Sequence, residues 1–98
     1  MYLKVHQSAK GAIVAACDED LIGKVLEEKD VYMDLAKHRN FYVGEKAGEK
    51  ELEAALGKCF SANLVGKGPV SVAVSMGLAG KDDIMYIKKI PYIQIYRI

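Results

Sequence analysis

The feature that most constrains the fold is residues 62–70, Ala-Asn-Leu-Val-Gly-Lys-Gly-Pro-Val, which predict a short strand, a glycine-rich turn and the start of a helix. Gly66 and Gly68 allow a positive φ or the close approach of another group to the backbone. Pro69 suits the first turn of a helix, where its missing N–H costs nothing. The glycines and the proline agree, so we expect a strand-to-helix connection at this point.

The helix that follows has a clear apolar stripe and a clear end. Val70, Ala73 and Val74 recur at helical spacing. Gly77 stands where a glycine commonly ends a helix, and Leu78 is placed to fold back on Ala73. We therefore predict a helix that opens at Pro69 and ends before Gly77.

The same turn is a candidate anion site. A helix beginning at Pro69 would place free backbone amides and a partial positive charge next to Lys67. The candidate anion-binding residues are Gly66, Lys67 and Gly68. The phosphate-binding pattern G-x-x-x-x-G-K-[S/T] is absent. The alternative is a tight turn that needs its glycines only for backbone geometry.

Hydrophobic patterning predicts the remaining elements. Residues 2–7 and 12–17 form one hairpin, residues 24–28 and 31–35 a second, and residues 84–87 and 93–98 a third, across a turn at residues 88–91. Residues 49–60 form an amphipathic helix, and the polar residues 36–48 form a surface loop. These elements indicate an α+β fold: a small antiparallel or mixed sheet built from hairpins, packed by two main helices. We expect a single domain over residues 1–98.

The last strand predicts a surface for a partner. Ile93 and Ile95 share one face, so the opposite face is available to solvent. The candidate nucleic-acid or partner surface consists of two lysines from the turn and three residues of that opposite face: Lys88, Lys89, Tyr92, Gln94 and Tyr96. Aromatic rings near cations are how single-stranded nucleic acid is held. The alternative is that these rings cover a second packing face or a dimer interface.

Charge is distributed unevenly along the chain. Residues 1–53 hold eight Lys/Arg against eleven Asp/Glu, a net charge of −3, and residues 54–98 hold six against two, a net charge of +4. The overall charge of +1 argues against a dedicated nucleic-acid protein. Because the C-terminal half carries the net positive charge, we expect any polyanionic partner to contact that half. The scarcity of Asn and Gln beside plentiful Lys and Glu leans towards a thermophile.

No catalytic or cofactor motif is present. The candidate nucleophiles, bases or metal ligands are Cys17, Cys59, His6 and His38, but their spacing predicts neither a catalytic set nor a metal site. Asp18, which stands in an acidic run, is expected to cap a short turn. No apolar run approaches the ~20 residues that span a bilayer. We expect a cytoplasmic protein without cofactor, metal or membrane association.

Four blocks carry a resemblance to a known family. They are Val14-x-x-Cys17-Asp18-Glu19-x-Leu21-x-Gly23-Lys24, Ala62-Asn63-Leu64-Val65-Gly66, Gly77-Leu78 and Ile90-Pro91-x-x-Gln94. Together they resemble an archaeal family catalogued as domain of unknown function 424. The resemblance implies an archaeal, cytoplasmic, single-domain protein and lends no activity. The family has a histidine two residues before the final glutamine, where this chain has Tyr92, so no role of that histidine carries over.

Three functions follow as hypotheses. The first is a non-enzymatic binding module for RNA or a ribonucleoprotein, whose binding should weaken with salt. The second is a protein-interaction domain, including a homodimer through the edge of the C-terminal hairpin. The third is an enzyme on a small anionic substrate, which requires a cavity that holds Lys67 together with a Cys or His.

Overall fold

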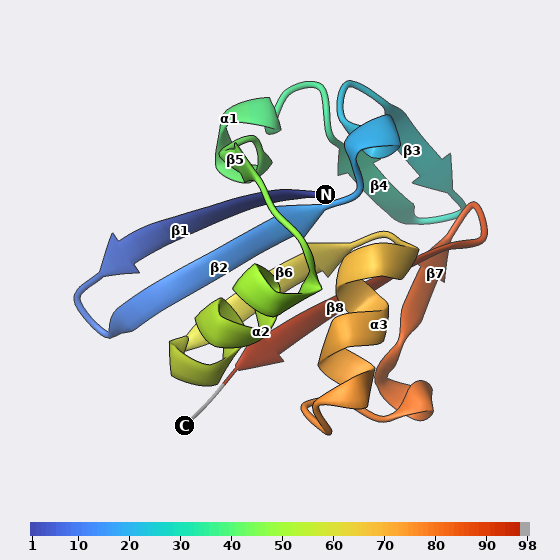
Figure 1. Ribbon diagram of the computed structural model, residues 1–98. Helices are drawn as coiled ribbons and strands as arrows, with labels where there is room; N and C mark the ends of the chain where they lie inside the picture. Colours follow the sequence, from blue (N-terminus) through green and yellow to red (C-terminus); the bar gives the residue numbers. More distant parts are fainter. Residues whose placement is uncertain (97–98) are drawn as a thin grey trace.

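A six-stranded mixed sheet organises the molecule in the computed structural model, which describes residues 1–96 (Figure 1). The strand order is β5 (Glu45–Lys46), β1 (Tyr2–Ser8), β2 (Gly11–Cys17), β6 (Ser61–Val65), β8 (Ile90–Tyr96) and β7 (Met85–Ile87). A separate two-stranded sheet pairs β3 (Val25–Glu28) with β4 (Val31–Asp34). The helices are α1 (Arg39–Tyr42), α2 (Glu49–Lys58) and α3 (Lys67–Ser75), with 3-10 turns η1 (Glu19–Leu21) and η2 (Lys81–Asp83). The predicted α+β class, with a mixed sheet and two main helices, is confirmed.

The centre of the sheet is the apolar strand β2. It pairs antiparallel with β1 and parallel with β6, so both of its edges are hydrogen-bonded. Its last four residues, Val14 to Cys17, are fully buried. A strand that is apolar throughout is typical of a position covered on both faces.

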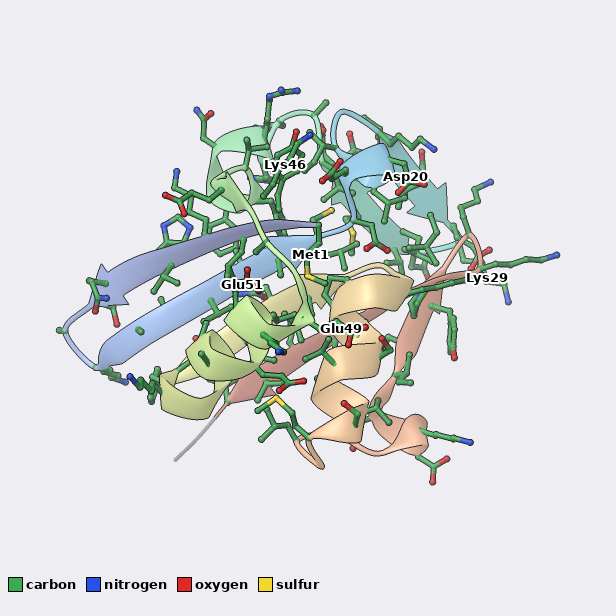
Figure 2. All side chains as sticks on the ribbon, in the orientation of Figure 1. Met1, Asp20, Lys29, Lys46, Glu49 and Glu51 are labelled. Carbon is green, nitrogen blue, oxygen red and sulfur yellow. The ribbon has the colours of Figure 1, made fainter. Side chains whose placement is uncertain are left out.

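Helices α2 and α3 lie on one face of the sheet, as Figure 1 shows. Leu52 and Leu56 of α2 are one helical turn apart and are both fully buried. The core between the layers also contains Val14, Ala16, Ala62, Leu64, Val70, Val72, Ala73, Ile93 and Ile95. The exposed Glu49 and Glu51, labelled in Figure 2, are in the first turn of α2, where negative charge is favourable.

Helix α3 begins at Lys67, two residues before the predicted start at Pro69. Gly66 is the N-cap, with a φ of 105° that favours glycine, and Pro69 lies within the first turn, where its missing N–H is tolerated. The predicted end is confirmed. Gly77 has a φ of 75°, and the Leu78 N–H donates to the Ala73 carbonyl at 3.0 Å.

The opposite face of the sheet is covered only in part, by the β3–β4 hairpin and α1. A second apolar cluster lies there, containing Cys17, Leu21, Leu26, Leu35, Val65 and Ile87. Residues 36–48, predicted as a loop, contain α1 and the short strand β5, which extends the sheet by pairing with β1. The N-terminal amine lies 3.6 Å from Glu19 Oε1 and Lys46 Nζ lies 3.7 Å from Glu19 Oε2, which ties β5 to η1 (Met1 and Lys46 are labelled in Figure 2).

The C-terminal hairpin has a tighter turn than predicted. Ile87 pairs with Ile90, so only Lys88 and Lys89 form the turn, with φ values of 52° and 65°. Strand β8 therefore begins at Ile90 rather than at residue 93. The predicted Arg97 and Ile98 end of this strand lies outside the described residues. No helix within residues 1–96 is long and apolar enough to cross a membrane.

Candidate nucleic-acid interface

The uncovered part of the sheet face opposite α2 and α3 is the candidate site, and we call it the open face. Strand alternation puts Tyr92, Gln94 and Tyr96 of β8 on this face, because Ile93 and Ile95 point into the helix-layer core. The Tyr96 side chain is 74% exposed and Gln94 is exposed, whereas Tyr92 is half-buried against the second apolar cluster. The register places Asn63 beside Gln94.

A groove of about 610 Å³ lies beside β8 on the open face. Its lining includes Tyr32, Met33 and Asp34 of β4, Phe41 and Tyr42 of α1, and Gln94. A smaller cavity of about 60 Å³ shares Met33, Tyr42 and Gln94 with it and reaches Asn63 and Tyr92. One side of the groove is therefore β4 and α1, and the other side is the polar surface of β6 and β8.

Helix α1 is fixed to β1 by contacts from two alternate residues. Lys4 Nζ donates to the Asn40 carbonyl at 2.6 Å, and His6 Nε2 donates to the Phe41 carbonyl at 2.9 Å. The rings of His6 and Phe41 stack, with centroids 4.6 Å apart and planes 11° apart. These contacts hold an aromatic wall in place, although α1 is only one turn long and has no buried residue.

The open face contains two side-chain amides that make no hydrogen bond to the rest of the described residues. Within residues 1–96, the side chains of Asn63 and Gln94 have no hydrogen-bond partner, and both are accessible to solvent. An amide presents one acceptor and two donor hydrogens. Two such groups between tyrosine rings are suited to contacting the edge of a planar polar ligand.

The rim of the groove holds one fixed negative charge. Backbone N–H groups of Lys37 and Ala36 donate to Asp34, at 2.7 Å and 3.1 Å, and the Lys37 bond is the main reason that the pKa of this carboxyl is lowered. The same carboxylate raises the pKa of the Tyr32 hydroxyl, which also donates to it. At neutral pH the rim therefore carries an ionised Asp34, a neutral Tyr32 and the cation of Lys37.

The five residues predicted for a nucleic-acid surface do not form one continuous patch. Gln94 and Tyr96 are exposed on the open face, and Tyr92 is partly covered. Lys88 and Lys89 lie in the β7–β8 turn at the opposite end of β8. Tyr96 is seven positions along the strand from Lys89, which corresponds to about 23 Å.

The open face also contains residues that were not predicted. Asn63, Phe41 and Tyr32 join it through strand register and through the placement of α1 and β4. These positions are distant in sequence, so only the pairing of β6 with both β2 and β8 reveals that they share a face. The local signal for Asn63 is alternation within β6, where the polar residues Ser61 and Asn63 alternate with the apolar Ala62 and Leu64.

The glycine-rich turn holds an anion that belongs to the chain itself. The Gly68 N–H donates to Asp18 Oδ2 at 3.2 Å, and a Cβ at Gly66 or Gly68 would overlap the same carboxylate. Asp18 was expected to cap its own short turn, but its side chain makes no bond to η1. The place predicted for an external anion at Gly66, Lys67 and Gly68 is therefore filled by Asp18.

Lys67 does not line a cavity with Tyr92, Tyr96 or the candidate catalytic residues. It lines two cavities beside α3, and neither is lined by a Cys or a His. The enzyme hypothesis required such a pairing, so the geometry gives that hypothesis no support. Lys67 belongs to the helix layer, on the opposite side of the sheet from Tyr92 and Tyr96.

The cysteines are both buried. Burial, with Asp18 and Asp20 adding to it, raises the pKa of the Cys17 thiol to about 12, so this residue is a poor nucleophile. Cys59 Sγ donates to the Leu56 carbonyl. His38 is exposed at the groove, and His6 is engaged with α1. Across residues 1–96 no three His, Cys, Asp or Glu residues are grouped to hold a metal ion.

Comparison with known proteins identifies a family. No curated protein matches the sequence. A solved structure described as an uncharacterized conserved protein from Methanopyrus kandleri is similar, with a TM-score of 0.77 and 27% identity over 98% of this chain and 92% of that one. The sequence profile of the family described as "Protein of unknown function (DUF424)" matches residues 6–98. Because that match covers nearly the whole chain, the protein belongs to the DUF424 family.

Proposed function

We propose that this protein is a small, non-enzymatic module that binds single-stranded RNA on its open face and acts within a ribonucleoprotein. The observation that carries the proposal is the combination of an exposed tyrosine, Tyr96, with the unpaired amides of Asn63 and Gln94 on a sheet surface that no helix covers. Sheets with helices on one face and aromatic rings on the other bind RNA by stacking bases on those rings.

The chemistry of the open face fits unstacked bases better than it fits a duplex. A base that stacks on an aromatic ring contributes about 1–3 kcal/mol, and any base has a face that can stack. The amides of Asn63 and Gln94 are then available for the polar edges of a base. The groove beside β4 and α1, at about 610 Å³, has room for such a group.

The charges around the groove predict a modest salt dependence. Lys4, Lys37 and Arg39 are the cations of β1 and of the segment beside the groove, and Asp34 opposes them. Three phosphate contacts on a single strand would give a slope of about −2 in a plot of log K against log salt concentration. Lys88 and Lys89 would add to this slope only for an RNA long enough to follow β8 to its other end.

The test compares two exposed tyrosines on opposite faces of the sheet. Binding of a fluorescein-labelled decamer of mixed single-stranded RNA is measured by anisotropy at ~50 mM salt. Tyr96→Ala should weaken binding at least about fivefold, the equivalent of about 1 kcal/mol. Tyr86→Ala, at a ring that is 58% exposed on β7, is the matched control and should leave the affinity unchanged. Absence of binding by the wild-type protein, or equal effects of the two variants, would contradict the proposal.

A second candidate is self-association through the edge of β8. Strand β7 pairs only with residues 90–92, so residues 93–96 have β6 on one edge and no strand on the other within the described chain. An exposed strand edge is able to pair with a second copy. Sedimentation at high micromolar concentration tests this candidate, and a monomer would count against it.

A further inference from the structure

A second groove, of about 450 Å³, lies between α3 and β7 on the helix-layer side of the sheet. We call it the α3–β7 groove. Its apolar lining consists of Val70 and Val74 of α3, Ile84 just before β7, Tyr86 of β7 and Pro91 of β8. It is separated from the open face by the thickness of the sheet, because Tyr86 and its partner Pro91 point to the helix side.

The two serines along the α3–β7 groove already hydrogen-bond to the helix backbone. Ser71 Oγ donates to the Gly68 carbonyl at 2.8 Å, and Ser75 Oγ donates to the Val72 carbonyl at 2.9 Å. The serine hydroxyl hydrogens therefore do not project into the groove as donors. What the groove offers a ligand is a strip of aliphatic carbon and one tyrosine ring, 58% exposed.

Each end of this groove carries a lysine with no ion pair. Lys67 lies in the first turn of α3 and Lys81 in η2, and neither takes part in an ion pair within residues 1–96. Two nearby carboxylates are used elsewhere, since Asp83 accepts from the Gly80 N–H at 2.8 Å and Asp18 accepts from Gly68. Asp82 directly follows Lys81 in the sequence but does not line the groove. No carboxylate lines the groove itself.

We propose that the α3–β7 groove binds a short extended segment of a partner protein in which acidic residues flank an apolar centre. Two unpaired cations at the ends of an apolar strip are complementary in charge to such a segment. The groove runs along residues 67–75 of α3, a rise of about 12 Å, which matches roughly four residues of extended chain. The site is independent of the RNA proposal, because it uses the other side of the sheet.

The probe is a set of fluorescein-labelled octapeptides with Asp or Glu at both ends and four central positions drawn from Val, Ile, Leu, Phe and Tyr. A matched set carries Lys at the ends. We expect binders only in the acidic set, with dissociation constants of about 100 µM or tighter at ~50 mM salt. Amide resonances along residues 70–75 and 84–87 should shift in a ¹⁵N correlation spectrum of the full chain, and those of residues 61–65 and 92–96 should shift less.

Five variants make the test specific. Tyr86→Ala should weaken the best acidic peptide at least about tenfold, whereas Tyr96→Ala should not, which reverses the pattern expected for RNA. Lys67→Glu with Lys81→Glu should move the preference to the lysine-ended set. Lys58→Glu, an exposed change at the end of α2, is the control for net charge and should keep the acidic preference. Lys81→Glu alone provides the same comparison if the double variant does not fold.

Several results would overturn the proposal. One is equal binding of both peptide sets, and another is binding that ignores Tyr86→Ala. A third is that single-stranded RNA, rather than any acidic peptide, shifts the resonances of residues 70–75. A fourth is that the groove is covered by a second copy of the chain, seen as a dimer that Tyr86→Ala dissociates.

Discussion

At the scale of single residues, the Asp18 carboxylate explains why residues 62–70 carry two glycines. Asp18 follows β2 directly, and its own N–H donates to the Val65 carbonyl at the end of β6. Its side chain then accepts from Gly68 at the start of α3, where negative charge is favourable. One residue thus joins a strand, its parallel neighbour and a helix. The glycines are needed because a Cβ at either position would occupy the space of that carboxylate.

Removal of this contact should have a measurable cost. Asp18→Ala leaves the first turn of α3 without its side-chain acceptor, and we expect a loss of about 1–2 kcal/mol in the free energy of unfolding. Asp18→Asn keeps an acceptor oxygen and should lose less. Urea denaturation of both variants measures the difference. An unchanged midpoint for Asp18→Ala would show that the contact adds nothing to stability.

A double-mutant cycle separates backbone geometry from the carboxylate contact. Gly68→Ala places a methyl group against Asp18 Oδ1, so it should destabilise the wild-type protein. In the Asp18→Ala background the clash is gone, and the same change should cost less, with a coupling of about 1 kcal/mol. Gly66 is unsuitable for this cycle because its φ of 105° strains any other residue. Equal costs in both backgrounds would refute the steric explanation.

The buried thiol of Cys17 predicts an alkaline loss of stability. Its pKa rises from 9.0 in the unfolded chain to about 12 in the folded protein, mainly through burial. The unfolded chain therefore loses its proton first, so stability is full below about pH 9 and falls as the pH rises towards 12. Cys17→Ala should lose less stability than wild type between about pH 8 and pH 10.5. Urea midpoints across this range give the comparison, and parallel curves would argue against a role for Cys17.

At the scale of elements, sequence patterns predicted the strands and helices whose residues carry a local hydrophobic pattern. Alternation located β1, a continuous apolar run located β2, helical spacing located α2, and Gly77 marked the end of α3. The pattern failed for α1 and β5, because α1 is a single turn held by tertiary bonds from Lys4 and His6 rather than by a buried stripe. For the same reason, the sequence did not predict the part of the open face that β4, α1 and β6 supply. Asn63, Phe41 and Gln94 meet only through strand register and tertiary placement, which residue spacing does not encode.

The turn between β7 and β8 is shorter than predicted because its two residues adopt an unusual conformation. Two-residue hairpin turns favour Asn-Gly, because both positions need a positive φ, yet Lys88 and Lys89 adopt 52° and 65°. Replacement of this pair by Asn-Gly should therefore raise the free energy of unfolding by about 1 kcal/mol. A Gln-Gln replacement removes the charges but keeps the backbone cost, so it is the control. If both replacements stabilise equally, charge repulsion rather than φ is the cause.

At the scale of the whole molecule, burial is graded from the sheet centre to the open-face wall. Val14 to Cys17 of β2 and the neighbouring Leu64 of β6 are almost entirely inaccessible, whereas the β3–β4 hairpin exposes Val25 and Tyr32. Within residues 1–96 this hairpin pairs with no strand of the main sheet. Regions with few buried contacts open at lower free energy than the core. The wall of the proposed RNA groove should therefore be among the least stable parts of the fold.

Hydrogen exchange tests this gradient and links it to function. Amides of β2 and β6 should exchange only through global unfolding, and those of β3 and β4 should exchange through a local opening at lower free energy. If single-stranded RNA occupies the groove, contacts with Tyr32 and Met33 should raise protection of β4 while leaving β2 unchanged. The acidic octapeptides should have no such effect on β4. Uniform protection across all strands, or RNA protection confined to α3, would mean that the hairpin is not the adjustable wall of the binding site.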